Sequence, residues 1–337
     1  MTRIFLTLLV VAGLSSCDNF ETDHPDFDYT SGFFPYQYPV RTLVLGDYIY
    51  DNTNDNNHKF VISVAIGGVY ENTKDRVFAF QINEDLCNEV LFSANGDTVR
   101  AMPPEYYTLS SDNQIVVPKG KFNGGIEVQL TDAFFNDTIA IQSGYIIPLQ
   151  LTGSDDVDRI LVGSSPSQDA DPRIAAQWTE LPKDFTMFAV KYINEYHGTY
   201  FHYGESSLRD GANAVIEDTT YQAKYVEQNI ISNLVTTGRN EVSFKTFLRS
   251  DIMEEEVEMV LTFDGNTCTI EGAEGSPFTI SGSGVFKSKE YTWGNKDRDG
   301  IEITYTASDG TYTYEATDVL VIRDRAVVME VYTPVVY

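Results

Sequence analysis

Basic residues are scarce in this sequence. It has 23 Lys and Arg against 50 Asp and Glu, which gives a formal net charge of -27 at pH 7. A surface of that sign repels nucleic acid and anionic head groups. We therefore expect no nucleic-acid partner, and we interpret the excess of acidic residues as a solvated surface.

Cysteine is also scarce, with only three residues in the chain. If Cys17 carries a lipid, as argued below, Cys87 and Cys268 remain. These two lie far apart in the sequence, and no metal-ligand spacing is present. The sequence therefore predicts two buried free thiols, without a disulfide between them.

Enzyme signatures are absent. The chain has no G-x-S-x-G, no H-E-x-x-H, no phosphate loop and no dinucleotide fingerprint. These absences favour a protein that is not an enzyme and needs no cofactor. A glycoside hydrolase requires only two well-placed carboxylates, so the 50 acidic residues leave that alternative open, although no pair stands out.

The apolar run at the N-terminus, Ile4 to Gly13, is too short to span a bilayer. Arg3 precedes it and Leu14-Ser15-Ser16-Cys17 follows it, which is the layout of a cleaved secretory signal. The tetrad resembles a bacterial lipobox, in which Cys17 becomes the lipidated first residue. Each buried methylene contributes about 0.8 kcal/mol, so acyl chains on this residue anchor a protein at a membrane. We predict a lipoprotein signal peptide over residues 1–16, with plain secretion as the alternative.

Sustained helical periodicity is missing, whereas residues that suit a pleated strand are abundant. The predicted fold class is therefore all-β. Residues 17–37 form an acidic, aromatic leader that we expect to be an extended tether. Short, evenly spaced strand-like runs fill residues 38–163 and favour an Ig-like β-sandwich.

A polar, irregular stretch over residues 164–185 predicts a linker between two domains. Residues 186–337 then hold an antiparallel meander with tight turns, such as Asp264-Gly265 and Asp309-Gly310. The run VEMVLTF (257–263) alternates apolar and other residues, as expected of a half-buried strand. Eight or more antiparallel strands in this length favour a lipocalin-like barrel, with an open sandwich as the alternative.

The stretch NEYHGTYFHYG, residues 194–204, is the densest aromatic segment of the chain. His197 and His202 lie five positions apart, so in an extended strand they point to opposite faces and do not converge on one metal. Aromatic faces also suit stacking on sugar rings, but strand parity gives half of this cluster to a core. We place a turn before the strand and keep Tyr196 and His197, at that turn, as candidates for ligand contact.

The two tryptophans are the first candidates for stacking on a sugar. Trp178 lies in the predicted linker and Trp293 in a predicted loop, where binding residues concentrate. The alternatives are an interdomain plug for Trp178 and a barrel cap for Trp293. Tyr291 is a second choice beside Trp293.

A weak calcium candidate lies at residues 295–300. Asn295, Asp297, Asp299 and Gly300 match the opening of a calcium loop. Thr306 occupies the position where such a loop needs a bidentate acid, and a polar hairpin turn explains the same residues. We therefore expect no metal here.

Several stretches together resemble one family. They are PVRTLVLGDYIYDNT (39–53), GGVYENTKDR (67–76), IVVPKGKFNGGIEVQLTDAFF (115–135), YIIPLQLTG (145–153), DPRIAAQW (171–178) and FAVKYINEYHGTYFHYG (188–204). They are similar to two-domain surface lipoproteins of Bacteroidetes whose N-terminal β-sandwich is a domain of unknown function. The resemblance covers nearly the whole mature chain.

This resemblance implies a function that the residues alone do not give. Such lipoproteins are typically encoded in polysaccharide-utilisation loci, beside an outer-membrane transporter and its glycan-capturing partner. The implied role is non-catalytic binding of a polysaccharide or oligosaccharide at the outer membrane, with the protein held by lipid on Cys17 and exposed on the cell surface. A structural or adhesive envelope protein is the alternative.

Overall fold

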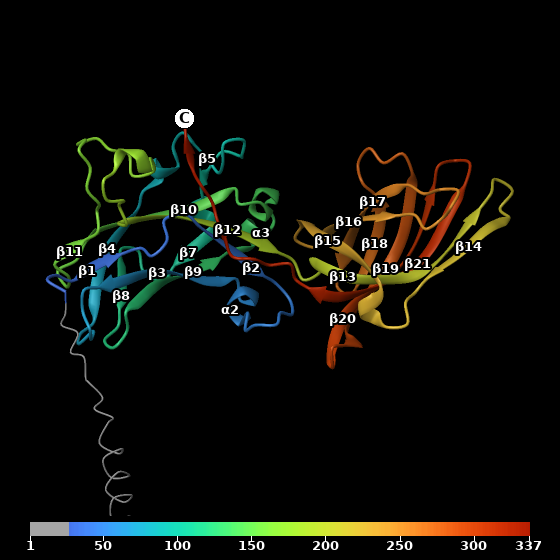
Figure 1. The fold of residues 1–337 in the computed structure, drawn as a ribbon, viewed down its shortest axis with the longest axis horizontal. Helices are drawn as coiled ribbons and strands as arrows, with labels where there is room; N and C mark the ends of the chain where they lie inside the picture. The colour runs from blue at the N-terminus through green and yellow to red at the C-terminus, as the bar shows by residue number, and fades with distance from the viewer. Residues whose placement is uncertain (1–26) are drawn as a thin grey trace, which may run out of the picture.

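The structure, a computed structural model, describes residues 27–337, so the predicted signal peptide and Cys17 lie outside the described residues. The fold is all-β, as predicted, and comprises a sandwich domain followed by a barrel domain (Figure 1). The helical segments are α2 (Thr53–Asn56), α3 (Asp132–Phe135), η1 (Glu84–Cys87), η2 (Pro104–Tyr106), η3 (Thr138–Ile141), η4 (Ala175–Gln177) and η5 (Val226–Gln228). None of the helices in residues 27–337 is long and apolar enough to cross a membrane.

Two sheets form the first domain. One has the order β11-β1-β3-β9-β7, and the other has the order β22-β2-β12-β10-β4-β8 with β6 paired to β10. Their strands are β1 (Ser31–Phe33), β2 (Pro39–Val44), β3 (Lys59–Gly67), β4 (Arg76–Ile82), β6 (Arg100–Ala101), β7 (Tyr107–Leu109), β8 (Gln114–Val117), β9 (Asn123–Leu130), β10 (Tyr145–Gly153), β11 (Arg159–Ile160), β12 (Phe185–Ile193) and β22 (Glu330–Val331).

The core of the sandwich follows from strand parity. In β3, Phe60, Ile62 and Val64 are buried while the residues between them are more exposed. Those side chains share one core cluster with Phe78 of β4 and Leu149 of β10, which belong to the other sheet. Period-two burial on the facing strands is what joins the two sheets.

The predicted tether over residues 17–37 is too long. Ser31–Phe33 form β1, which pairs with β3 and β11. Phe34 follows it and is buried in the sandwich core. The apolar pair Phe33-Phe34 gains more from burial than an extended tether would give it.

The predicted linker over residues 164–185 is a loop of the first domain and does not join the two domains. After it, β12 pairs with β10 and runs parallel to β2, in the centre of the second sheet. The strand that the sequence assigned to the start of the barrel therefore belongs to the sandwich. The chain crosses to the barrel only at residues 194–197.

The second domain is a closed antiparallel barrel, which confirms the favoured alternative. Its sheet has the order β14-β13-β15-β16-β17-β18-β19-β20-β21, and pairing of β13 with β21 closes it into eight strands, with β14 outside the closed ring. The strands are β13 (Gly198–Arg209), β14 (Val215–Tyr221), β15 (Ile230–Gly238), β16 (Glu241–Phe247), β17 (Glu256–Asp264), β18 (Thr267–Gly272), β19 (Thr279–Trp293), β20 (Lys296–Ser308) and β21 (Thr313–Asp324).

Alternating apolar residues fill the barrel interior. Val257, Met259, Leu261 and Phe263 of β17 are all buried in one core cluster, as their spacing predicted. Cys268 is buried in the same cluster, and within residues 27–337 it and Cys87 are free, as expected. Burial raises the pKa of both thiols, to about 11 for Cys268 and about 12 for Cys87, so both stay protonated at neutral pH.

The C-terminal tail leaves the barrel and returns to the first domain, as the red trace in Figure 1 shows. Val331 of β22 pairs with Pro39 of β2, and β23 (Val335–Val336) pairs with β5 (Val90–Leu91). The prediction that residues 186–337 form one domain is therefore corrected at both ends. The tail and the crossing segment connect the two domains twice.

Candidate ligand cavity at the domain junction

The crossing segment Asn194–His197 is fixed by hydrogen bonds of Asn194. Its side-chain nitrogen donates to the carbonyl oxygens of Gly238 and Glu241 at 3.0 and 2.9 Å, and its side-chain oxygen accepts from the backbone nitrogens of Tyr196 and His197 at 3.1 Å. Asn194 is itself buried. One amide therefore sets the direction in which the chain enters the barrel.

Arg325, at the exit from the barrel, joins both domains. Its guanidinium donates to the carbonyl oxygens of Leu45 and Asp47, at 2.9 and 2.8 Å, and to that of His197 at 2.7 Å; it also donates to the carbonyl oxygen of Asn194. The side chain is buried, and this burial lowers the pKa of Arg325. Four backbone carbonyls thus satisfy a buried cation and fix the two domains relative to each other.

A cavity of about 530 Å³ lies beside this contact, between the two domains. We call it the junction cavity. Tyr48, Ile49 and Tyr50 of the loop between β2 and α2 line it from the first domain. Tyr200 and Phe286 line it from the barrel, as do residues 322–324 at the end of β21, and residues 325–328 line it from the start of the tail. Ligand sites occur preferentially in clefts between domains, where side chains of two units converge.

Ile49 and Tyr50 of this loop are exposed and Tyr48 is partly buried, although the loop itself is anchored. Tyr50 is 69% and Ile49 is 68% exposed, and the rings of Tyr48 and Tyr50 meet edge to face at 5.5 Å between centroids. Asn52 holds the base of the loop by donating to the carbonyl oxygens of Val44 and Gly46, both at 2.8 Å. Large apolar surface on a fixed loop at a cavity rim is the usual composition of a binding surface.

Gly46 allows the loop to approach the crossing segment closely. Its φ is +83°, and a Cβ there would lie 2.5 Å from the Cβ of Glu195. Any other residue would be strained in its backbone and would push the loop away from the junction. The position of Tyr48 and Tyr50 therefore depends on this glycine.

Four carboxylates line the cavity, those of Asp47, Glu195, Asp299 and Asp324, and the three aspartates are held by structural partners. Asp47 forms an ion pair with Lys289, and Asp299 accepts from the backbone nitrogen of Lys289 at 2.9 Å. Asp324 accepts from the backbone nitrogen of Ala326, also at 2.9 Å. These bonds fix the carboxylates in place.

Two other hollows of similar size offer different chemistry. One, of about 600 Å³, runs across β14, β13, β21 and β20 and is lined by Ser, Thr, Asp, Glu and Ala, together with Tyr305, which is buried. The other, of about 510 Å³, lies between the C-terminal tail and the loop at 172–182 and is mainly apolar. Of these three hollows, the junction cavity is the one that combines an exposed tyrosine with charged groups from both domains.

Trp293 lies on the outer wall of the barrel, at the end of β19, instead of in the predicted loop. Its indole nitrogen donates to the carbonyl oxygen of Ile322 at 2.8 Å, and its ring meets Phe201 edge-on at 5.2 Å. The guanidinium carbon of Arg298 lies 4.2 Å from its ring centroid. Trp293 therefore supports Arg298, a residue that lines the junction cavity. Nearby, the hydroxyl of Tyr291 donates to Glu302 at 2.7 Å.

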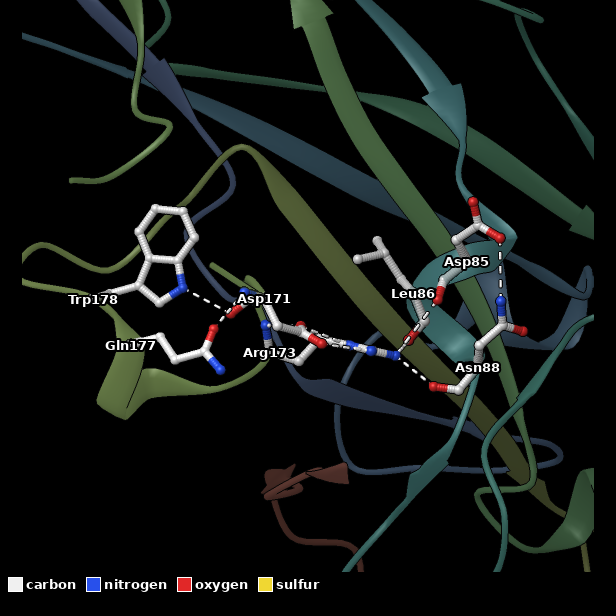
Figure 2. A network of polar contacts seen from close by, with 7 residues as sticks. All are labelled: Asp85, Leu86, Asn88, Asp171, Arg173, Gln177 and Trp178. Atoms are coloured by element: carbon white, nitrogen blue, oxygen red, sulfur yellow. Dashed lines mark hydrogen bonds and ion pairs between the residues drawn. The ribbon is translucent and has the colours of Figure 1, made fainter. Parts of the chain in front are cut away.

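Trp178 lies in the long loop of the first domain, outside the lining of the junction cavity. Its indole nitrogen donates to the carbonyl oxygen of Asp171 at 2.7 Å, as Figure 2 shows. The Asp171 carboxylate pairs with Arg173, which donates to the carbonyl oxygens of Leu86 and Asn88 at 3.1 and 2.6 Å (Figure 2). The hydrogen bonds from Arg173 lower the pKa of Asp171. The network ties this loop to the segment around η1.

Tyr196 and His197 are structural parts of the junction. Tyr196 is 4% exposed, stacks on Phe263 at 3.5 Å and donates to the carbonyl oxygen of Gly265 at 3.0 Å. The His197 Nδ1 accepts from the backbone nitrogen of Thr236 at 3.0 Å. Burial, followed by the charges of Arg325 and Lys191, lowers the pKa of His197 to about 4. This histidine is therefore neutral at pH 7.

The calcium candidate forms a β-hairpin. Gly294 and Asn295 both have positive φ, +60° and +58°, and Trp293 pairs with Lys296 across the turn. Asp297 is exposed, and Asp299 accepts hydrogen bonds from Ser288 and Lys289. Within residues 27–337, no group of three or more His, Cys, Asp or Glu residues could hold a metal ion. A two-residue turn with positive φ accounts for this segment.

Both domains match known families. Residues 27–158 match a family model described as an N-terminal domain, and residues 195–326 match Domain of unknown function (DUF5627). A solved protein of unknown function from Bacteroides ovatus is 34% identical, with a TM-score of 0.86, over 92% of this chain and 100% of that protein. The chain belongs to the same family as that Bacteroides ovatus protein.

More distant solved structures also come from Bacteroides ovatus. A multidomain protein including DUF1735 is 13% identical with a TM-score of 0.43, over 87% of this chain and 94% of that one. A proposed carbohydrate binding protein is 10% identical with a TM-score of 0.29, over 88% and 98%. No curated protein matches the sequence.

The bounds of the DUF5627 match agree with the junction seen in the structure. The match begins at residue 195, directly after Asn194, and ends at residue 326, directly after Arg325. The two residues that fix the domains therefore delimit this unit of the family. The match excludes β12 and the C-terminal tail, both of which lie in the first domain.

The sequence did contain a signal for the tyrosines of the cavity. Tyr48, Ile49 and Tyr50 stand between Gly46-Asp47 and the polar run that begins at Asp51. Large apolar residues inside a polar turn have no core to occupy within that turn, which marks them as candidates for a surface contact.

Proposed function

We propose that this protein is a surface-anchored lipoprotein that binds a glycan in the junction cavity without cleaving it, as part of a polysaccharide-utilisation system. The observation that carries the proposal is the pair of Tyr50, which is exposed, and Tyr48, which is partly buried, at the rim of a cavity of about 530 Å³ between two fixed domains. The family resemblance in the sequence supports the same role.

The geometry suits a sugar ring. Tyrosine faces stack on the C–H face of a pyranose, and their hydroxyls and nearby charged groups can bond its hydroxyl groups. The contacts of Arg325 and Asn194 keep the two walls of the cavity in place before a ligand arrives. Such preorganisation lowers the entropic cost of binding.

The carboxylates support binding without catalysis. Glycoside hydrolysis needs one carboxylic acid to donate a proton and another carboxylate to act as base or nucleophile. Asp47, Asp299 and Asp324 are each engaged by a lysine side chain or a backbone nitrogen of the protein itself. A hydrolase would need one of them protonated and free.

Lipid on Cys17 would place this site at the outer membrane, although that residue lies outside the described residues. Anchored sites act at high effective concentration, so a weak single site is sufficient to retain a polymer. An outer-membrane transporter complex is the partner that this arrangement would serve.

The test is affinity electrophoresis of the chain from Asp18 onward in gels that contain a panel of plant and host polysaccharides. We expect at least one polysaccharide to retard the protein, and Tyr50→Ala to weaken that retention by about tenfold. Tyr36→Ala is the matched control, because Tyr36 is 54% exposed but lies outside the cavity lining.

Three results would count against the proposal. Retention by no polysaccharide would favour the structural or adhesive alternative. Equal weakening by the two tyrosine variants would remove the junction cavity as the site. Release of new reducing ends from a retained polysaccharide would show that the protein is a hydrolase.

A further inference from the structure

Arg298 of β20 lines the junction cavity, and its side chain is positioned by a contact with Trp293. Its guanidinium carbon lies 4.2 Å from the ring centroid of Trp293, so the guanidinium rests against the indole. The indole is in turn fixed by its bond to the carbonyl oxygen of Ile322 at 2.8 Å and by its contact with Phe201. Such a cation–π contact orients the guanidinium without using any of its hydrogen-bond donors.

Those donors are unused within the part of the chain that the structure describes. There, the Arg298 side chain forms no hydrogen bond or ion pair, and its Nε is buried without an acceptor. The other arginines of the cavity differ, because Arg325 donates to four carbonyl oxygens and Arg323 lies 3.6 Å from a carboxylate oxygen of Asp324. Arg298 is therefore the arginine of this cavity that remains available to a ligand.

A buried hydrogen-bond donor without an acceptor destabilises the free protein, so a ligand that supplies an acceptor is favoured at this position. Leaving such a group unsatisfied is unfavourable, and an acceptor brought by a ligand would remove that cost. A planar guanidinium matches a planar carboxylate through two parallel hydrogen bonds. A neutral hydroxyl can satisfy one donor but cannot match this geometry or the charge.

We propose that the junction cavity recognises an acidic sugar, with Arg298 binding the carboxylate of a uronic acid residue while Tyr48 and Tyr50 contact the sugar ring. This inference rests on the proposed function and names the class of its ligand. The overall charge makes it testable, because a chain with a net charge of -27 does not adsorb acidic polymers without a specific site.

The experiment compares uronate polysaccharides with their own neutral forms. Gels contain polygalacturonate, alginate or glucuronoxylan, or the same polymers after reduction of their carboxyl groups, in about 0.15 M salt to screen long-range charge. Dextran sulfate is included to separate carboxylate recognition from general binding of anions. The chain from Asp18 onward is run beside Arg298→Gln, Arg298→Lys and the matched control Arg100→Gln, which removes one exposed arginine outside the cavity.

We expect at least one uronate polymer to bind ten times more tightly than its reduced form. Arg298→Gln should remove this difference while lowering the thermal unfolding midpoint only slightly, since it loses the cation–π contact with Trp293 but breaks no side-chain hydrogen bond or ion pair within residues 27–337. Arg298→Lys should lose most of it, because lysine keeps the charge but not the planar fork. Arg100→Gln should bind as the unmodified chain does.

Equal binding of a polymer and its reduced form would overturn this inference and leave the proposed function intact. Unchanged uronate binding by Arg298→Gln or Arg298→Lys would also overturn it. Binding of dextran sulfate as tight as that of the uronate polymer would replace carboxylate recognition by general anion binding and refute it too. Retention by none of the acidic or neutral polymers would instead remove the proposed function.

Discussion

The contact made by Arg325 predicts that the two domains unfold as one unit. Its guanidinium donates to two carbonyl oxygens of the first domain, those of Leu45 and Asp47, and to two of the crossing segment, those of Asn194 and His197. Arg325→Met keeps most of the side-chain volume and removes every donor. At about 1 kcal/mol for each hydrogen bond, and with the carbonyls left buried, the loss in unfolding free energy is about 3–5 kcal/mol.

The two tryptophans make this prediction measurable, since the first domain contains Trp178 and the barrel contains Trp293. Trp178→Phe leaves a fluorescent reporter in the barrel, and Trp293→Phe leaves one in the first domain. In urea, the two reporters should give coincident transitions for the chain with Arg325. With Arg325→Met, both transitions should move to lower urea and separate from each other.

Arg323→Met is the matched control for this experiment. Arg323 is half-exposed, and its only ion pair within residues 27–337, with Asp324, has a separation of 3.6 Å. An exposed pair of this kind contributes at most about 1 kcal/mol, so the control should stay close to the original midpoint. Coincident transitions at an unchanged midpoint in Arg325→Met would refute the claim that this residue couples the domains.

Three further predictions concern the junction and the loop of the first domain. Tyr196→Phe should cost about 1 kcal/mol by losing the bond to Gly265, and Tyr196→Ala about 3–5 kcal/mol by emptying the space against Phe263, both measured by urea unfolding; equal costs would contradict this packing. Burial lowers the pKa of His197 to about 4 in the folded chain. This histidine therefore binds a proton near pH 6.5 in the unfolded chain but only near pH 4 in the folded chain. Stability should therefore fall by about 2–3 kcal/mol between pH 6.5 and 4, and His197→Asn should lose less over that range; parallel curves would contradict this assignment. Trp178→Ala should leave glycan retention unchanged, because the residue lies outside the cavity lining; a loss of retention without a loss of stability would place the ligand elsewhere.

The sequence predicted those parts of the fold that follow from local periodicity. Alternation in VEMVLTF correctly indicated a half-buried strand, and the sustained meander correctly favoured a closed barrel. The prediction of the domain boundary was wrong because MFAVKYI is buried on both faces, and its local sequence does not indicate which strands it pairs with. Its pairing with β10 and β2 depends on residues that are distant in sequence, which periodicity does not encode.

The candidate site was predicted less well than the fold, for a similar reason. Tyr196 looked available at a turn, but Phe263, a distant residue, stacks on it and buries it. Trp293 was placed in a loop, whereas the long strand β19 reaches it. Tyr48 and Tyr50 form a cavity rim only because the tail and the barrel approach their loop, and no local pattern reports that contact.

The most direct test of the central claim is a crystal structure of the protein with an oligosaccharide from a polysaccharide that retains it. The account predicts sugar density in the junction cavity, with a ring against Tyr48 or Tyr50 and the walls in the positions described for the free protein. Density in the groove across β14 and β13, or beneath the C-terminal tail, with the junction cavity empty, would contradict it.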